Sequence, residues 1–472
     1  MDEMIPAQKR SAILRYLQYG CLLAVVLAEL VFLSPMGQRS GLALVTVDYF
    51  LAIPAMAFLM LSFARDIKGK GLAPMVLGLG MLVWFCLAQG FRAYFERALI
   101  EPGGMICCYA LALPLAFGME DGQRQRGLKT LTLTFLAEGL LLTVLGLGLR
   151  FGFLPQAFAD TVRWDGARLL QLSHPNNCAV MLMLGIGICL ALCFRTKRVW
   201  CRAIFVVLAL AQFGVQIMNH GRTSTVATCL LVGGILFCAI RKTGWKRAPL
   251  ALAAAVGVMV MMYISAQGLY TLHEKSLTQA SLQAAQEETE GIAETVQEST
   301  GEKDPSRSYL PGVKEDGTLE VTNTQNDLRQ DLANLNGRTA IWKAAIQGAK
   351  GDRKLLISGA DDPAAILSEN GVPYAQHTHN SFLETLYILG LPGLLIALAV
   401  TLLALRGAAL LLWRNEDLWK SSMAMIALCL LACGLLEPYL FTAKYYHHYL
   451  NIFFLTVVGY LHQWTVEERK TR

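Results

Sequence analysis

Residues 377–405 read HTHNSFLETLYILGLPGLLIALAVTLLAL. From Ser381 to Leu405 this stretch is apolar apart from a few hydroxyl groups and one carboxylate, that of Glu384. A helix of about 20 apolar residues is long enough to cross the hydrocarbon core of a bilayer, which is about 30 Å thick. The stretch therefore predicts a membrane-spanning helix that begins directly after a polar segment.

Similar apolar stretches recur along the chain, which has 472 residues, of which 54% are hydrophobic and only 16% charged. This composition argues against two or three soluble domains. We expect an all-α polytopic membrane protein with about 12 transmembrane helices. The spans expected before a large polar loop are Ala12 to Phe32, Leu42 to Phe63, Leu72 to Phe91, Gly104 to Met119, Leu128 to Leu149, Asn176 to Phe194, Val199 to Met218, Ser224 to Ile240 and Ala248 to Ala266. The spans expected after it are Ser381 to Leu405, Ser421 to Phe441 and Tyr449 to Trp464.

The orientation follows from the basic residues, because Lys and Arg accumulate in short cytoplasmic loops. With both termini in the cytoplasm, the inner segments hold about 22 Lys and Arg and the short outer segments about eight, and the asymmetry alternates loop after loop. We expect helices 1–9 in residues 1–266, one large extracytoplasmic loop between helices 9 and 10 in residues 267–379, and helices 10–12 with a cytoplasmic tail in residues 380–472.

The large loop is expected to be mainly helical, with helices from Ser276 to Ala293 and from Arg338 to Gly348. It holds ten Lys and Arg against seventeen Asp and Glu between Gln267 and Thr378, so it is not a nucleic-acid surface. An acidic, low-complexity insertion at residues 287–331 has no evident catalytic content. The twelve cysteines lie in or beside apolar spans and are interpreted as small hydrophobes.

Polar side chains gather where the loop enters the tenth span. His379 precedes that helix together with His377, while Asn380 and Glu384 are four residues apart and share one helical face. Neutral imidazole is a competent general base for a hydroxyl group. Ordinary helix capping at a membrane edge is the alternative explanation. The Gly390-Leu-Pro-Gly393 break inside the span favours irregular backbone that lines a cavity.

Two arginines on the same outer side are candidates for binding phosphate, because guanidinium groups bind phosphate oxygens in a bidentate manner. Arg222 opens the eighth span and Arg338 lies in the loop before His379. Pairing with the acidic loop or contact with lipid headgroups would also explain them. Further candidate lining residues are Arg168, Asn176, whose side chain could instead cap a helix, and Glu437 in the last outer turn.

Several catalytic motifs are missing from the sequence. It contains no glycine-rich phosphate loop, no His-Glu-x-x-His and no nucleophile elbow. The carboxylates of Asp361 and Asp362 are the only pair suited to a divalent metal beside a sugar diphosphate, and no nucleotide-binding pattern surrounds them. We therefore expect neither a metal site nor a cofactor.

These motifs together resemble the O-antigen ligase and O-antigen polymerase superfamily of bacterial envelope glycan assembly. The resemblance rests on His379 to Glu384 followed by Gly390 to Gly393, on Gly337-Arg338 with Trp342, on Gly221-Arg222, and on Pro175-Asn176 with Ala179. It implies a metal-independent, inverting glycosyltransferase in the bacterial cytoplasmic membrane. The donor would be an oligosaccharide linked to undecaprenyl diphosphate on the outer leaflet, and the acceptor a glycan or glycolipid. The resemblance assigns the acceptor base to His379 and the leaving diphosphate to Arg222 and Arg338.

Three alternatives stay open at this point. Polymerases and ligases share these motifs, so the sequence does not separate them. Broken helices and an intramembrane carboxylate also describe a polytopic transporter of a small solute or ion, although no matching halves are visible. A scaffold in an envelope assembly complex is the third alternative.

Overall fold

The computed structural model describes residues 121–155, 175–219, 221–269, 337–373, 375–441 and 448–470, apart from position 243, together with isolated positions at 80–88, 159, 271, 272 and 275. Within these ranges all regular elements are helices, which confirms the expected all-α class. The first two spans and the fourth, the helix from Ser276 to Ala293, the insertion at 287–331 and Arg168 lie outside the described residues. The count of twelve spans therefore stays a prediction.

Six described helices are long and apolar enough to cross a membrane. They are Leu131–Phe151 within α7 (Asp121–Phe151), Asn176–Arg195 within α9 (Pro175–Arg195), α10 (Val199–Met218), α11 (Arg222–Arg241), helix Ala248–Leu269 and α17 (Ser381–Arg414). Each contains a predicted span. The shorter α18 (Leu418–Gly434) and the C-terminal α19 (His448–Lys470) match the last two predicted spans approximately.

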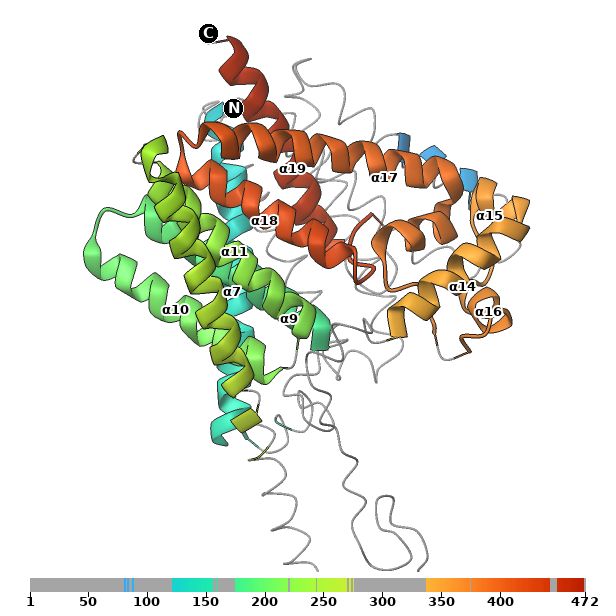
Figure 1. Cartoon of the computed structure of the whole chain (residues 1–472), viewed down its shortest axis with the longest axis horizontal. Helices are drawn as coiled ribbons and strands as arrows, with labels where there is room; N and C mark the ends of the chain where they lie inside the picture. The colour runs from blue at the N-terminus through green and yellow to red at the C-terminus, as the bar shows by residue number, and fades with distance from the viewer. Residues whose placement is uncertain are drawn as a thin grey trace, which may run out of the picture.

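Helix α9 lies at the centre of the bundle. It packs against α7, α10, α11 and α18, and Figure 1 shows α7, α9, α10 and α11 grouped together. Its side chains from Cys178 to Cys189 are almost completely buried, whereas the outer face of α10 exposes large apolar residues such as Val207 and Leu210. A bundle with apolar side chains both inside and outside is what a lipid environment allows.

Helix α17 is kinked near its start, as the Gly-Leu-Pro-Gly motif predicted. Gly390 has φ 68° and ψ −170°, which is not helical, and Pro392 follows inside the helix. A Cβ at position 390 would lie 2.3 Å from the carbonyl oxygen of Ile357, so only glycine allows this approach. The carbonyl of Leu389 accepts a hydrogen bond from the indole of Trp84 at 2.6 Å, which satisfies a backbone group beside the kink.

The loop helices dock on the segment of α17 before the kink. They are α14 (Arg338–Gly351), α15 (Arg353–Ser358) and α16 (Pro363–Glu369), and they lie together at one side of the bundle in Figure 1. Their apolar residues form a separate core with Leu386 and Tyr387 of α17. The hydroxyl of Tyr387 donates to the carbonyl of Ala345 at 2.7 Å, and the amide of Ala360 donates to the carbonyl of Tyr387 at 2.7 Å. Helix α14 confirms the predicted helix from Arg338.

The eleventh predicted span ends earlier than expected. The prediction placed its end at Phe441, but α18 ends at Gly434 and residues 435–441 form an irregular turn. Pro438 explains the difference, because proline lacks an amide donor and disfavours helical backbone at the preceding residue. That preceding residue is Glu437, so the turn presents a carboxylate to the end of the bundle.

Candidate functional site

Four segments that are far apart in the sequence meet at one end of the bundle. They are the start of α9, the start of α14, the loop before α17 and the turn after α18. Three side chains from the first three segments bind the Glu437 carboxylate, which the fourth supplies. We call Glu437, Asn176, Arg338 and His379 the carboxylate cluster.

Glu437 is the centre of this cluster and is 4% exposed. Its Oε1 accepts hydrogen bonds from Nδ2 of Asn176 at 2.9 Å and from Nη2 of Arg338. Its Oε2 lies 3.0 Å from Nδ1 of His379. Both oxygens of a buried carboxylate are therefore bound, as a buried charge requires.

The environment of Glu437 keeps it ionised. Burial by itself raises its pKa, but the hydrogen bond from His379 and the charges of Arg338, His379 and His377 outweigh burial and lower the pKa to about 2. An ionised carboxylate only accepts hydrogen bonds, so Nδ1 of His379 must be the donor. In the neutral imidazole the lone pair then lies on Nε2.

Backbone geometry holds His379 between two anchored neighbours. Its φ is 49°, and its amide donates to Nδ1 of His377 at 3.2 Å. On one side, the amide and hydroxyl of Thr378 both donate to Oε2 of Glu384 at 2.9 Å. On the other side, Oδ1 of Asn380 caps α17 by accepting from the amides of Phe382 and Leu383. The imidazole is thus fixed by residues that do not themselves bind Glu437.

Asn380 and Glu384 were predicted as site lining, and the structure gives both a positioning role. Asn380 is the helix cap that the alternative explanation expected, and its Nδ2 also donates to the carbonyl of Leu435 at 2.8 Å. Ser381, which the sequence reasoning missed, ties the same two segments together. Its hydroxyl donates to the carbonyl of Glu437 at 2.9 Å and accepts from the amide of Leu440 at 3.0 Å.

Arg338 reaches the cluster because Gly337 precedes α14 with φ 73°, a left-handed conformation that glycine adopts without strain. The guanidinium is buried, and its Nε has no hydrogen-bond partner in the described part of the chain. The same holds for Nε1 of Trp342, one turn further along α14. Two buried N–H donors on one helical face suit a ligand rich in acceptor oxygens. A tryptophan four residues after the arginine is the sequence signal for this pair.

Arg222 lies at the same end of the bundle but is not one of the three residues that bind Glu437. It is the first residue of α11, directly after Gly221. A Cβ on Gly221 would lie 2.1 Å from that of Ala179, so the start of α11 packs against α9 one turn from Asn176. The backbone of Arg222 therefore lies near the start of α9, from which Asn176 enters the carboxylate cluster.

The two carboxylates considered for a metal have structural roles. Oδ2 of Asp361 accepts from Nζ of Lys354 at 2.6 Å, and Asp362 caps α16. In the described ranges no group of three or more His, Cys, Asp or Glu side chains is arranged to hold a metal ion.

The low pKa of Glu437 predicts a stability change in acid. A carboxyl group whose pKa falls from 4.5 to about 2 on folding stabilises the folded chain above pH 4.5 and loses this contribution as the pH falls towards 2. The loss should amount to about 3 kcal/mol. Unfolding of the intact chain and of Glu437→Gln, followed by tryptophan fluorescence between pH 6 and 2.5, measures it. The difference in unfolding free energy between the two proteins should become smaller as the pH falls. A difference that stays constant would contradict the low pKa of Glu437.

The fold and this site define a multi-pass helical membrane protein with a polar cluster at one end of its bundle. A family model described as O-antigen ligase matches residues 210–398, less than half of the chain. This segment of the chain is therefore similar to the O-antigen ligase family, which supports the resemblance seen in the sequence motifs. The segment contains Arg222, Arg338 and His379, whereas Asn176 and Glu437 lie outside it. No curated protein sequence matches the chain.

Proposed function

We propose that this O-antigen ligase or polymerase-type protein transfers or polymerises glycan from an undecaprenyl diphosphate carrier, by an inverting and metal-independent reaction on the outer leaflet. The observation that carries the proposal is the 3.0 Å contact between Nδ1 of His379 and Glu437, with Arg338 bound to the same carboxylate. This contact couples a candidate base to a candidate anion-binding group. The catalytic and binding roles given below to His379, Arg338 and Arg222 are part of this proposal.

His379 acts as the general base. Glu437 binds its Nδ1–H, so the Nε2 lone pair is available to the acceptor. As the acceptor oxygen attacks the anomeric carbon, its proton passes to Nε2, and the imidazolium that forms is stabilised by Glu437. The His379 side chain is 29% exposed, so an acceptor hydroxyl can approach the ring.

The leaving group is the lipid diphosphate, which departs with the electron pair of the glycosidic bond. Arg338 donates a hydrogen bond to Glu437 through Nη2, and its Nε–H, which has no partner among the described residues, can donate to a phosphate oxygen. Arg222 supplies the second positive charge. A single displacement from the face opposite the leaving group inverts the anomeric centre, and positioning with charge stabilisation suits this step.

The location of the cluster supports an outer-leaflet reaction. Helices α9, α11 and α17 begin at the end of the bundle that holds the carboxylate cluster and end in Arg195, Arg241 and Arg414 at the opposite end. Basic residues mark the cytoplasmic side, so the cluster faces away from the cytoplasm. With the twelve expected spans both termini are cytoplasmic, and the protein lies in the bacterial inner membrane. The identity of the acceptor, a glycan or a glycolipid, distinguishes a polymerase from a ligase.

The test is a transfer assay with the purified full chain in lipid nanodiscs and an undecaprenyl diphosphate-linked oligosaccharide. We expect elongated or transferred glycan, release of the lipid diphosphate, and an anomeric configuration opposite to that of the donor by NMR. The rate should change less than twofold when EDTA is added. Loss of activity in EDTA would contradict a metal-independent reaction. A product with the same anomeric configuration as the donor would contradict an inverting reaction.

A further inference from the structure

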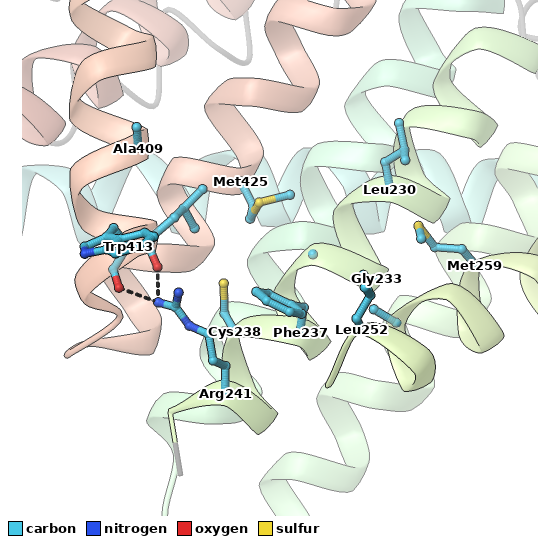
Figure 2. A pocket seen from close by; sticks show the side chains of 13 residues that line it. Leu230, Gly233, Phe237, Cys238, Arg241, Leu252, Met259, Ala409, Trp413 and Met425 are labelled. Carbon is cyan, nitrogen blue, oxygen red and sulfur yellow. Dashed lines mark hydrogen bonds between the residues drawn. The ribbon is translucent and has the colours of Figure 1, made fainter. Parts of the chain in front are cut away.

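An apolar groove lies at the opposite end of the bundle from the carboxylate cluster. It encloses about 470 Å³ between α11, helix Ala248–Leu269, the end of α17 and α18. Figure 2 shows side chains from all four helices facing it. Its apolar lining includes Leu230, Phe237, Leu252, Met259, Ala409 and Met425.

The shape of the groove fits one lipid chain. Along α11 it extends from Leu230 to Arg241, which corresponds to about 16 Å of helix and so to about one leaflet of hydrocarbon. Its volume lies in the range of about 300–1,000 Å³ that is usual for sites of small ligands. Leu230 and Leu252 are 47% and 58% exposed, so the groove is open on the side that faces lipid.

Arg241 closes the polar end of the groove. It is 7% exposed, and its Nη2 donates to the carbonyl of Trp413 at 2.7 Å and to that of Leu412 (Figure 2). These carbonyls belong to the last turn of α17, which has no helical amide donors left for them. Arg241 thus joins α11 to α17 and fixes the width of the groove.

Exposed cations follow Arg241 in the connection to the next helix. Lys242, Lys246 and Arg247 are exposed within the seven residues 241–247, which join the two helices that form one wall of the groove. Across the groove, the junction of α17 and α18 carries Arg414 and Lys420 together with Glu416 and Asp417, and Asp417 caps α18. The balance of charge at this end is positive.

We propose that the groove binds an acyl chain of an anionic phospholipid, whose headgroup phosphate contacts Lys242 and Lys246. Basic sites between transmembrane helices on the cytoplasmic side favour anionic headgroups over zwitterionic ones. Apolar walls alone would accept any phospholipid, so the cations determine the selectivity. The proposal is independent of glycan transfer, because lipid binding is measured without donor or acceptor.

Native mass spectrometry of the delipidated full chain tests the headgroup contact, with dioleoyl phosphatidylglycerol and dioleoyl phosphatidylcholine as probes. We expect the intact chain to prefer phosphatidylglycerol by about twentyfold, and Lys242→Gln with Lys246→Gln to bind the two lipids about equally. Lys197→Gln with Arg198→Gln removes the same charge from the α9–α10 connection at the same end of the bundle. This control should keep the preference. Equal binding by the intact chain, or equal losses in both variants, would overturn the proposal.

A second pair of variants tests the acyl chain contact. Ala409→Trp places a large side chain in the groove, whereas Leu402→Trp places one on a lipid-facing position of α17 outside it. The first should reduce binding of phosphatidylglycerol by tenfold or more, and the second by less than twofold. Thermal unfolding shows whether each variant is folded. If folded Ala409→Trp binds as the intact chain does, the lipid lies elsewhere and the groove assignment is wrong.

Discussion

Replacing His379 by alanine is expected to reduce glycan transfer by about 10³-fold, because the acceptor hydroxyl then loses its only proposed base. The change removes an imidazole that is partly exposed and leaves the Arg338–Glu437 ion pair in place, so the protein should still insert and fold. Lipid-linked oligosaccharide profiles of cells and the nanodisc assay both measure the loss. The lipid-linked oligosaccharide donor should accumulate while little transferred glycan forms.

The control for this prediction is His462→Ala, which removes a half-buried imidazole from the distal part of α19. It should leave glycan transfer within twofold of the intact chain. Normal polymer length in the His379→Ala variant, with the protein present in the membrane, would exclude His379 as the base. In that case the carboxylate cluster would be a structural ion pair.

The replacement of Glu437 by glutamine should have the largest effect on stability. Glutamine has nearly the same shape, but the buried guanidinium of Arg338 then lacks a counter-charge, which costs about 3–5 kcal/mol. An amide also accepts less strongly from Nδ1–H of His379, so the ring loses its fixed tautomer and the support for its protonated form. We expect glycan transfer to fall by about 10²- to 10³-fold. Chemical unfolding and the nanodisc assay measure the two effects separately.

A double variant separates these two consequences. Combining Glu437→Gln with Arg338→Gln removes both charges, so much of the lost unfolding free energy should return. Activity should not return, because the anion-binding group and the orienting carboxylate are both absent. If the double variant is as unstable as Glu437→Gln, the buried charge of Arg338 is not the cause of the instability. If Glu437→Gln alone keeps full activity, the orienting role is wrong.

Local sequence patterns predicted the helices well because they depend on local interactions. The run from Val199 to Met218 is apolar apart from Arg202, Gln212 and Gln216, and it forms a helix with these bounds. The break at Gly390 followed by Pro392 was also predictable, since both residues act on their own backbone. The end of the eleventh span was wrong because its apolar composition continues past the position where Pro438 ends α18.

The candidate site was predicted as a set of residues but not as an arrangement. Arg338 was predicted to bind the diphosphate and His379 to activate the acceptor, yet both side chains bind the same carboxylate. Glu437 was only a candidate lining residue, since a glutamate in an outer turn has no local signature. Thr378 and Ser381 were missed because their partners, Glu384 and the Glu437 turn, become visible only in the folded chain.

The sequence by itself determined that the chain is a helical membrane protein, and it predicted an orientation from the basic residues and the residue types that could perform glycan transfer. These properties follow from hydropathy, charge and short motifs, all of which act over a few residues. Only the tertiary structure decided that Glu437 joins Asn176, Arg338 and His379, which lie as far as 261 positions apart in the chain. The physical reason is that a buried carboxylate must find its partners wherever the packed helices bring donors within hydrogen-bond distance.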